Sequence, residues 1–160
     1  MNSTEPQAPS ATLTTMKIHP PLLAGALLLV TLALHFMLPE ERNVGWEQVI
    51  GLIVVAIGVG VSSFAAAIFQ GRETTRNPYG EPTAFVAVSP YTWTRNPMYL
   101  GLASALFGLA IFFGSITMLL APAVFFAVID RVVIPREEET MERLFGQDYR
   151  NYTNRVRRWI

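Results

Sequence analysis

Two polar segments of this 160-residue chain carry side chains that could bind or transform a ligand. The first is TRNPMYLG at residues 94–101, in which Arg95 and Asn96 stand directly before Pro97 and an apolar run. Proline suits the first turn of a helix, so we expect Asn96 at or near the N-cap, where free N–H groups favour a bound carboxylate. The structural alternative is a capped membrane helix whose Arg95 extends to the lipid headgroups.

The second segment is the C-terminal tail, in which Glu137, Glu138 and Glu139 follow a proline. Acids in a first helical turn suit the helix dipole, and a row of like charges is usually a solvated face, so a structural role explains the pattern. If the tail lies on the same side of a membrane as Arg95 and Asn96, one of these carboxylates can instead hold a cationic or polyhydroxyl ligand. The pattern leaves both interpretations open.

The composition favours an integral membrane protein, because 51% of the residues are hydrophobic and only 15% are charged. A bilayer core about 30 Å thick takes roughly 20 apolar helical residues per crossing. We therefore predict an all-α integral membrane protein with about four transmembrane helices, whose cytoplasmic loop and C-terminal helical tail form a ligand pocket. The predicted spans cover about residues 21–38, 49–70, 98–113 and 115–134.

The breaks between apolar stretches indicate the domain organisation. Only Gly114 and Ser115 separate the last two spans, which favours an antiparallel hairpin over one long span with a re-entrant piece. The first apolar run is about 18 residues long and lacks a clear cleavage site, so we interpret it as a retained anchor rather than a signal peptide. Residues 1–17 are polar and bear prolines, which predicts a disordered tail, and residues 18–160 form a single membrane domain.

The basic residues predict the orientation in the membrane. Of the 12 Lys and Arg, Arg42 alone lies in the first connection, whereas seven lie from Arg131 onward, at the end of the last span and after it. The positive-inside rule then places both termini and the 71–98 connection in the cytoplasm, at the cell inner membrane. No basic helix or aromatic-basic platform for nucleic acid occurs, and without cysteine or a metal-binding motif we predict no metal site.

Some residues of the spans have structural roles as their simplest explanation. His35, alone in the first span, is expected to be packed or to lie at the lipid interface. Asp130, at the end of the last span, is expected to extend to the headgroups or to pair with Arg131. Three glycines of the second span are expected to allow close helix packing: Gly51, Gly58 and Gly60.

The two polar segments together resemble a known family. The order SPYTWTRNPMYLG, a helical hairpin and REEETMERLFGQDYRNYTNRVRRW is similar to the isoprenylcysteine carboxyl methyltransferase family, as a bacterial-type member, and to the related membrane phospholipid N-methyltransferases. The family pattern is G-x-Y-x-x-x-R-[HN]-P-x-Y-x-G, followed after about 40 residues by E-E, F-G and Y-x-x-Y. The resemblance covers roughly residues 50–160. One departure is Val133, which stands where the isoprenylcysteine enzymes carry a substrate-contacting arginine.

The resemblance implies that the cytoplasmic loop, the hairpin and the tail enclose S-adenosylmethionine, and that a lipid or lipid-modified substrate enters from the bilayer. Arg131 and Arg95 are the candidates for substrate binding, and no catalytic residue is assigned. Carried over by position, the cofactor-binding residues are Thr83, Ala84, Phe85, Val86, Tyr91, Asn96, Pro97, Met98, Tyr99, Glu137 and Glu138.

We therefore predict an S-adenosylmethionine-dependent methyltransferase acting at the cytoplasmic membrane face on an amphiphilic acceptor, an isoprenylcysteine-type carboxylate or similar. The sulfonium is already a strong electrophile, so the protein mainly has to align the acceptor and exclude water. The alternative is a phospholipid N-methyltransferase. A membrane NADPH-dependent reductase shares a similar C-terminal region but has more spans, and a non-catalytic membrane protein is the remaining alternative.

Overall fold

The computed structural model describes residues 18–38, 45–72 and 88–160, and these residues form helices and connections without strands. The predicted disordered tail at 1–17 lies outside the described residues. The all-α prediction is confirmed. In chain order the elements are α1 (Pro20–Met37), α2 (Trp46–Arg72), α3 (Pro97–Phe113), the 3₁₀ turn η1 (Thr117–Leu119), α4 (Leu120–Val128), the π-helical turn η2 (Ile129–Val133) and α5 (Ile134–Thr153).

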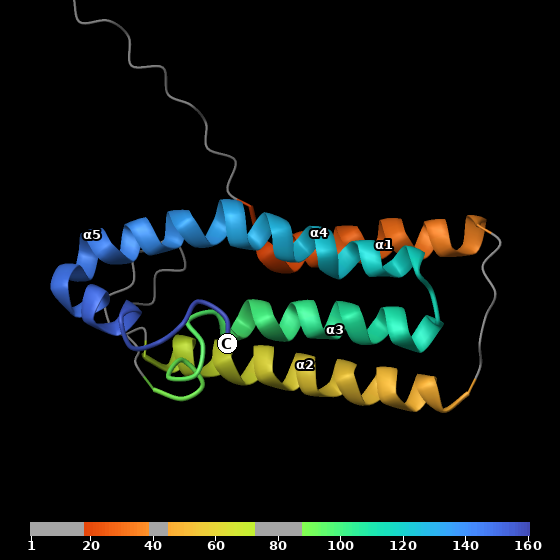
Figure 1. Ribbon diagram of the computed structural model, residues 1–160, viewed down its shortest axis with the longest axis horizontal. Helices are drawn as coiled ribbons and strands as arrows, with labels where there is room; N and C mark the ends of the chain where they lie inside the picture. The colour runs from red at the N-terminus through yellow and green to blue at the C-terminus, as the bar shows by residue number, and fades with distance from the viewer. Residues whose placement is uncertain (1–17, 39–44, 73–87) are drawn as a thin grey trace, which may run out of the picture.

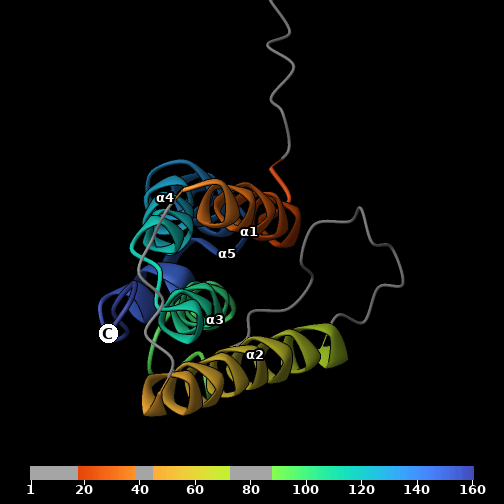
Figure 2. The ribbon, with the colours of Figure 1, turned by 90° about the vertical axis from the view of Figure 1, so that its right-hand side faces the viewer.

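Four apolar helices lie side by side along the long axis of the molecule (Figure 1). In the end view, α1 and α4 lie together, and α3 and α2 lie below them (Figure 2). Within the described residues, the stretches Pro20–Met37, Trp46–Phe69 and Thr117–Thr153 are long and apolar enough to cross a membrane. The α3 helix is equally apolar but has 17 residues, about 25 Å of helix, which is slightly short of a full crossing.

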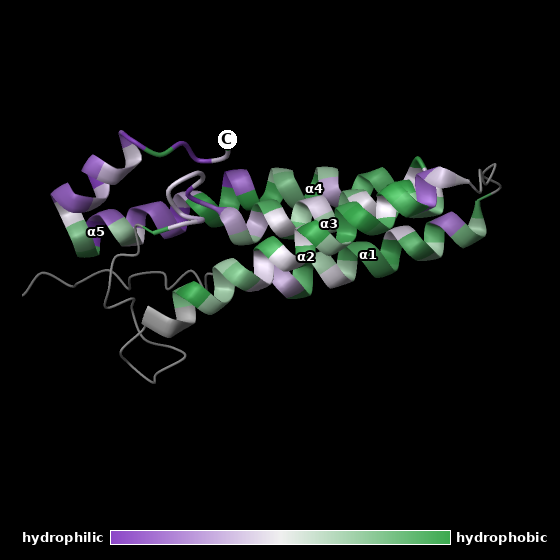
Figure 3. Ribbon diagram, turned by 90° about the horizontal axis from the view of Figure 1, so that it is seen from below, coloured by the Kyte–Doolittle hydropathy of each residue, from purple (hydrophilic) through white to green (hydrophobic). Residues whose placement is uncertain are grey.

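Apolar side chains cover the outside of the bundle, as expected for contact with lipid tails. Leu29 on α1 and Ile57 on α2 are 69% and 61% exposed. Colouring by hydropathy shows the bundle as hydrophobic and α5 with the C-terminal segment as largely hydrophilic (Figure 3). His35, in contrast, is buried and lies against the rings of Phe36 and Phe113, so the packed interpretation of this residue is confirmed.

The predicted helical hairpin forms at Gly114 and Ser115. Gly114 ends α3 in the left-handed region at φ 58°, which glycine adopts without a Cβ penalty. Its N–H donates to the carbonyl of Ile111 at 3.0 Å. Ser115 Oγ then accepts the N–H of Met118 at 3.2 Å, so the chain enters η1 and α4 at once. α3 and α4 therefore run antiparallel with a short connection (Figure 1).

The backbones of α2 and α3 come into close contact at paired glycines, seven residues apart on each helix. A Cβ atom built on Gly58 would lie 2.6 Å from the carbonyl oxygen of Gly101, and one on Gly101 would lie 2.5 Å from that of Gly58. Gly51 and Gly108 meet in the same way one heptad away. The expected close packing is confirmed at Gly51 and Gly58, whereas Gly60 faces open space, so the expectation for that residue is wrong.

We expect Gly58→Leu to lower the free energy of unfolding by about 1–3 kcal/mol, because a larger side chain forces the two backbones apart. Denaturant unfolding of the purified protein in detergent micelles measures this loss. Gly60→Leu is the matched control on the same helix, because no atom lies within 4 Å of a Cβ built there. Equal destabilisation by both substitutions would contradict the close-packing role.

Candidate functional site

The start of α3, the helix α5 and the C-terminal segment Asn154–Ile160 meet beyond one end of the apolar bundle (Figure 3). α4 continues through η2 into α5, and the apolar stretch ends at Ile134, so α5 extends outside it. After α5 the chain turns back, and the N–H of Arg95 donates to the carbonyl of Arg157 at 3.0 Å. Two segments about 60 residues apart in the sequence thus form one polar cluster.

The first turn of α3 begins as predicted, with Asn96 at the N-cap and Pro97 in the first helical turn. The Asn96 side chain makes no capping hydrogen bond to its own helix. Its Nδ2 donates instead to the carbonyl of Arg158 at 3.0 Å, and Thr94 Oγ1 donates to the same oxygen at 3.0 Å. The C-terminal segment therefore holds the side chains that precede α3.

Tyr99 and Glu137 form the closest link between α3 and α5. The Tyr99 hydroxyl donates to Glu137 Oε1 at 2.6 Å. Glu137 keeps contact with solvent, but its carboxyl group faces the protein, and the loss of water around it raises its pKa. The Tyr99 hydrogen bond lowers this pKa, and the charge of Glu138 raises it. Glu137 therefore holds its proton more tightly than an ordinary glutamate.

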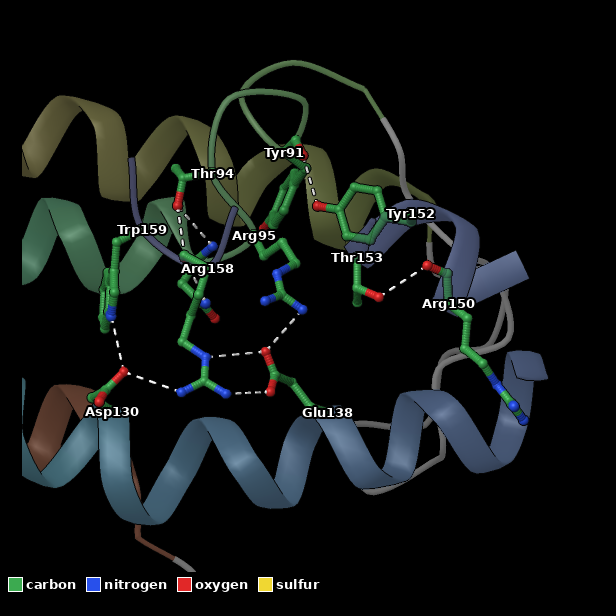
Figure 4. A network of polar contacts seen from close by, with 11 residues as sticks. Tyr91, Thr94, Arg95, Asp130, Glu138, Arg150, Tyr152, Thr153, Arg158 and Trp159 are labelled. Carbon is green, nitrogen blue, oxygen red and sulfur yellow. Dashed lines mark hydrogen bonds and ion pairs between the residues drawn. The ribbon is translucent and has the colours of Figure 1, made fainter. Parts of the chain in front are cut away.

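Glu138 lies between two arginines. Arg95 Nη1 lies 3.1 Å from Glu138 Oε1, and Arg158 Nη2 lies 2.6 Å from Oε2 (Figure 4). Nη1 of Arg158 also lies 3.3 Å from Oδ1 of Asp130 in η2. The indole N–H of Trp159 donates to the same Asp130 oxygen at 2.9 Å. Asp130 therefore pairs with a residue of the C-terminal segment, and the expectation that Arg131 would be its partner is wrong.

Tyrosines of α5 and of the segment before α3 close the side of the cluster near α2. The Tyr91 hydroxyl donates to the carbonyl of Ala65 in α2 at 3.2 Å, and the Tyr152 hydroxyl donates to the carbonyl of Tyr91 at 2.6 Å. Burial raises the pKa of Tyr91 to about 12, and the charge of Glu137 adds to this effect. Tyr149 stacks at a tilt near Tyr152, with ring centroids 6.1 Å apart. These phenols stay neutral near pH 7 and offer aromatic faces with polar tips.

The structure brings most of the predicted site residues to this one end of the molecule. Pro97 is buried in the first turn of α3, and Met98 packs beside Tyr91. Arg131 is exposed on η2. The predicted cofactor residues Thr83, Ala84, Phe85 and Val86 lie outside the described residues. A ligand-binding role for each of these side chains remains a prediction.

The motif comparison missed the contribution of the C-terminal segment. Arg158 and Trp159 belong to the closing RVRRWI, which indicates the orientation and contributes to the family resemblance but supplied no predicted site residue. The signal was the combination of an indole and a guanidinium after the Y-x-x-Y pair, since both are strong donors for carboxylates. Nothing in the local pattern, however, identifies Asp130 and Glu138 as the acceptors.

An apolar groove of about 600 Å³ lies between α3 and α4 and is open to the surroundings. Its wall contains one hydroxyl, that of Ser104, among otherwise apolar side chains. Phe126 lines the groove and lies against Trp159, with ring centroids 4.5 Å apart. The remaining lining residues are Ala103, Phe107, Leu119, Pro122 and Ala123. The groove thus approaches the polar cluster at the Phe126–Trp159 contact.

Residues 46–148 match the family model described as "Phospholipid methyltransferase". The chain belongs to this family. The family lies in the isoprenylcysteine/phospholipid methyltransferase superfamily, which confirms the resemblance found in the motifs. An uncharacterized protein of Haemophilus influenzae is 38% identical over 63 residues, which make up 39% of this chain and all of that relative. No solved structure matches the chain.

Membership of the phospholipid methyltransferase family supports methyltransferase activity in a protein whose helices are suited to a membrane. The matched region includes Arg95, Tyr99, Glu137 and Glu138. It ends before Arg158, so part of the polar cluster lies outside the family match. The cluster is therefore described by this structure and not by the family pattern alone.

We expect Tyr99→Phe to raise the pKa of Glu137 further, because the substitution removes a hydrogen bond that stabilises the ionised carboxylate. Carbon-13 NMR of the glutamate carboxyl groups in micelles, titrated with and without the substitution, measures the shift. Glu137→Gln identifies the resonance that belongs to this residue. An unchanged midpoint in Tyr99→Phe would show that the hydroxyl does not stabilise the charged form.

Proposed function

We propose that this protein transfers a methyl group from S-adenosylmethionine to the polar headgroup of an amphiphilic acceptor at the cytoplasmic face of the membrane. The observation that carries the proposal is the Tyr99–Glu137 pair, which stands where the apolar bundle meets the polar cluster. An acid at this boundary can hold a cationic group while an attached or neighbouring chain stays in apolar surroundings. The family of the chain supports the reaction type.

The charges of the cluster fit a cationic cofactor. Glu138 is compensated by Arg95 and Arg158, whereas the described residues form no ion pair with Glu137. The charge of Glu137 is therefore available to a sulfonium or ammonium group, and the tyrosines nearby offer faces for cation–π and stacking contacts. S-adenosylmethionine supplies a methyl group that its positive sulfur already activates. The side chains of this site then have to bind, orient and exclude water.

The groove between α3 and α4 supports an amphiphilic acceptor. Its apolar lining suits an alkyl chain, and its end at Trp159 lies beside the Asp130 carboxylate. A molecule with its chain at the level of the groove would place its headgroup at the polar cluster. The depth of the acceptor's alkyl chain in the bilayer would then determine where the reacting atom of its headgroup lies.

A primary or secondary amine is the acceptor that the structure favours within this class, and a phospholipid amine is its simplest form. Val133 occupies the position of the arginine that would hold a prenylcysteine carboxylate, and it is buried in the apolar core. Arg95 and Arg158 both contact Glu138, so their charge is already compensated. A carboxylate acceptor would lack an uncompensated cation between these two arginines, whereas an amine needs none, because it attacks the methyl group as the neutral base after it has lost a proton to solvent.

The test is incubation of the purified protein with methyl-labelled S-adenosylmethionine and separate acceptors. Vesicles containing phosphatidylethanolamine test the amine, a farnesylated cysteine tests the carboxylate, and phosphatidylcholine vesicles are the control without a free amine. We expect label in phosphatidylethanolamine. Label in the cysteine ester would favour the first prediction from the motifs, and absence of both labelling and cofactor binding would contradict the proposal.

We expect Glu137→Gln to weaken binding of S-adenosylmethionine by about tenfold or more, which corresponds to about 1.4 kcal/mol of binding free energy, and to weaken binding of S-adenosylhomocysteine, whose sulfur is uncharged, by less. Calorimetry in detergent measures both ligands. Glu139→Gln is the matched control, because it removes the same charge from an exposed position two residues along α5. Similar losses in both variants would show that general negative charge, and not the Tyr99-bound carboxylate, attracts the cofactor.

The pH dependence of cofactor binding follows from the raised pKa of Glu137. Only the ionised carboxylate attracts a cation, so affinity should fall as pH decreases through this pKa. The pKa of an ordinary glutamate is about 4.3. Because the pKa of Glu137 is raised, the loss of affinity should begin at a higher pH than in a site with an ordinary glutamate. Calorimetry of S-adenosylmethionine between about pH 8 and about pH 5 measures the profile. Glu137→Gln should flatten it, and an unchanged profile in that variant would assign the titration to another group.

A further inference from the structure

The C-terminal segment Asn154–Ile160 lies across the predicted site, although the family match ends at residue 148. The segment leaves α5 after Thr153 and returns to the start of α3 (Figures 1 and 4). Its contacts therefore connect α3 with η2 and α5. Arg158 takes part in these contacts through both its backbone carbonyl and its side-chain guanidinium.

The guanidinium of Arg158 joins two acids on different turns of the same helical path. Nη2 and Nε lie 2.6 Å and 3.3 Å from the two oxygens of Glu138, and Nη1 lies 3.3 Å from Asp130 (Figure 4). The planar fork of an arginine suits this arrangement, because it can donate to a carboxylate through two nitrogens. Glu138 is thereby held in one orientation, with its second cation, Arg95, on the other side.

The backbone of the same residue holds the start of α3. The carbonyl of Arg158 accepts Thr94 Oγ1 and Asn96 Nδ2, both at 3.0 Å. Trp159 then anchors the segment, because its indole donates to Asp130 and its ring lies on Phe126 of the groove wall. Arg158 and Trp159 together therefore contact the start of α3, the carboxylates of Asp130 and Glu138, and the end of the groove.

We propose that Arg158 is a positioning residue for methyl transfer, which compensates and orients Glu138 so that Glu137 alone presents an uncompensated carboxylate to the cationic ligand. This inference rests on the proposed function. Without the Arg158 guanidinium, Glu138 loses one of its two cations, and its charge repels that of the adjacent Glu137. The groups that act on Glu137 from the described elements are Tyr99 and Tyr91 on the α3 side and Glu138 on its own helix.

The test compares Arg158→Gln, Arg158→Lys and the matched control Arg157→Gln, which removes the same charge from an exposed neighbouring side chain. Calorimetry with S-adenosylmethionine measures affinity as a function of pH, and thermal unfolding in micelles measures folding. We expect the pH midpoint of Arg158→Gln to rise, because Glu137 is harder to ionise beside a less compensated Glu138, and we expect about tenfold weaker binding at a pH below that midpoint. Arg158→Lys should restore the midpoint, and Arg157→Gln should match the wild type.

A double-substitution cycle identifies Glu138 as the residue through which Arg158 acts. In a Glu138→Gln background, Arg158→Gln should change affinity less than about twofold, because the residue next to Glu137 then carries no charge to compensate. If Arg158→Gln alone fails to fold, the comparison of Glu138→Gln with the double variant keeps the test available, because a change well above about twofold between them would overturn the inference. The double variant takes one partner from Asp130 and one from Arg95. An equal effect of Arg158→Gln in both backgrounds would overturn the inference, as would a single variant with wild-type affinity and midpoint.

Failure of the proposed function has a different outcome. If the wild type binds neither S-adenosylmethionine nor its product, the proposed function is wrong, and the carboxyl NMR titration of Glu137 decides the positioning role by itself. A higher midpoint in Arg158→Gln than in Arg157→Gln then supports the role of Arg158. Identical midpoints overturn it.

Discussion

The close contact between the backbones of α2 and α3 is the constraint on which the rest of the structure depends. Gly58 and Gly101 bring the two helices so near that a Cβ on either would overlap the other backbone. Gly101 lies two residues after Tyr99, so this contact also determines where the first turn of α3 stands. Lipid offers no hydrophobic driving force for two helices to associate, so van der Waals packing between the backbones is one of the few interactions that can set this position.

The arginines of the polar cluster compensate negative charge next to the apolar bundle. Glu138 follows Glu137 directly and shares the Arg158 guanidinium with Asp130, and like charges that lie close together repel. Arg95 and Arg158 compensate Glu138, and Arg158 reaches Asp130 as well. Partly buried ion pairs add little to stability after desolvation, so their main effect is geometric. In the proposed function, they leave Glu137, which accepts a hydrogen bond from the neutral Tyr99 phenol, as the acid for a cationic ligand.

The site combines a part common to the family with a part described by this structure. The family match covers the helices that carry Tyr99 and Glu137, which supports methyl transfer as the reaction. The C-terminal segment lies beyond that match and joins the groove wall at Phe126 to the acids through Trp159. In the proposed function, the buried Val133 and the compensated arginines are the reasons to favour an amine headgroup over a carboxylate.

The sequence by itself determined the elements and the class of the protein. Apolar stretches of membrane length, the proline at the start of α3 and the Gly114–Ser115 break act through local backbone preferences, so they predicted the helices, the N-cap at Asn96 and the hairpin. The two motifs with their order predicted the family. Tertiary structure alone decided the partners of Asp130, Glu138 and the Asn96 amide, because these depend on how the chain returns after α5. Contacts across 20 to 64 residues leave no local periodic signal, and charge counting gave Arg158 the same meaning as the exposed Arg157 beside it.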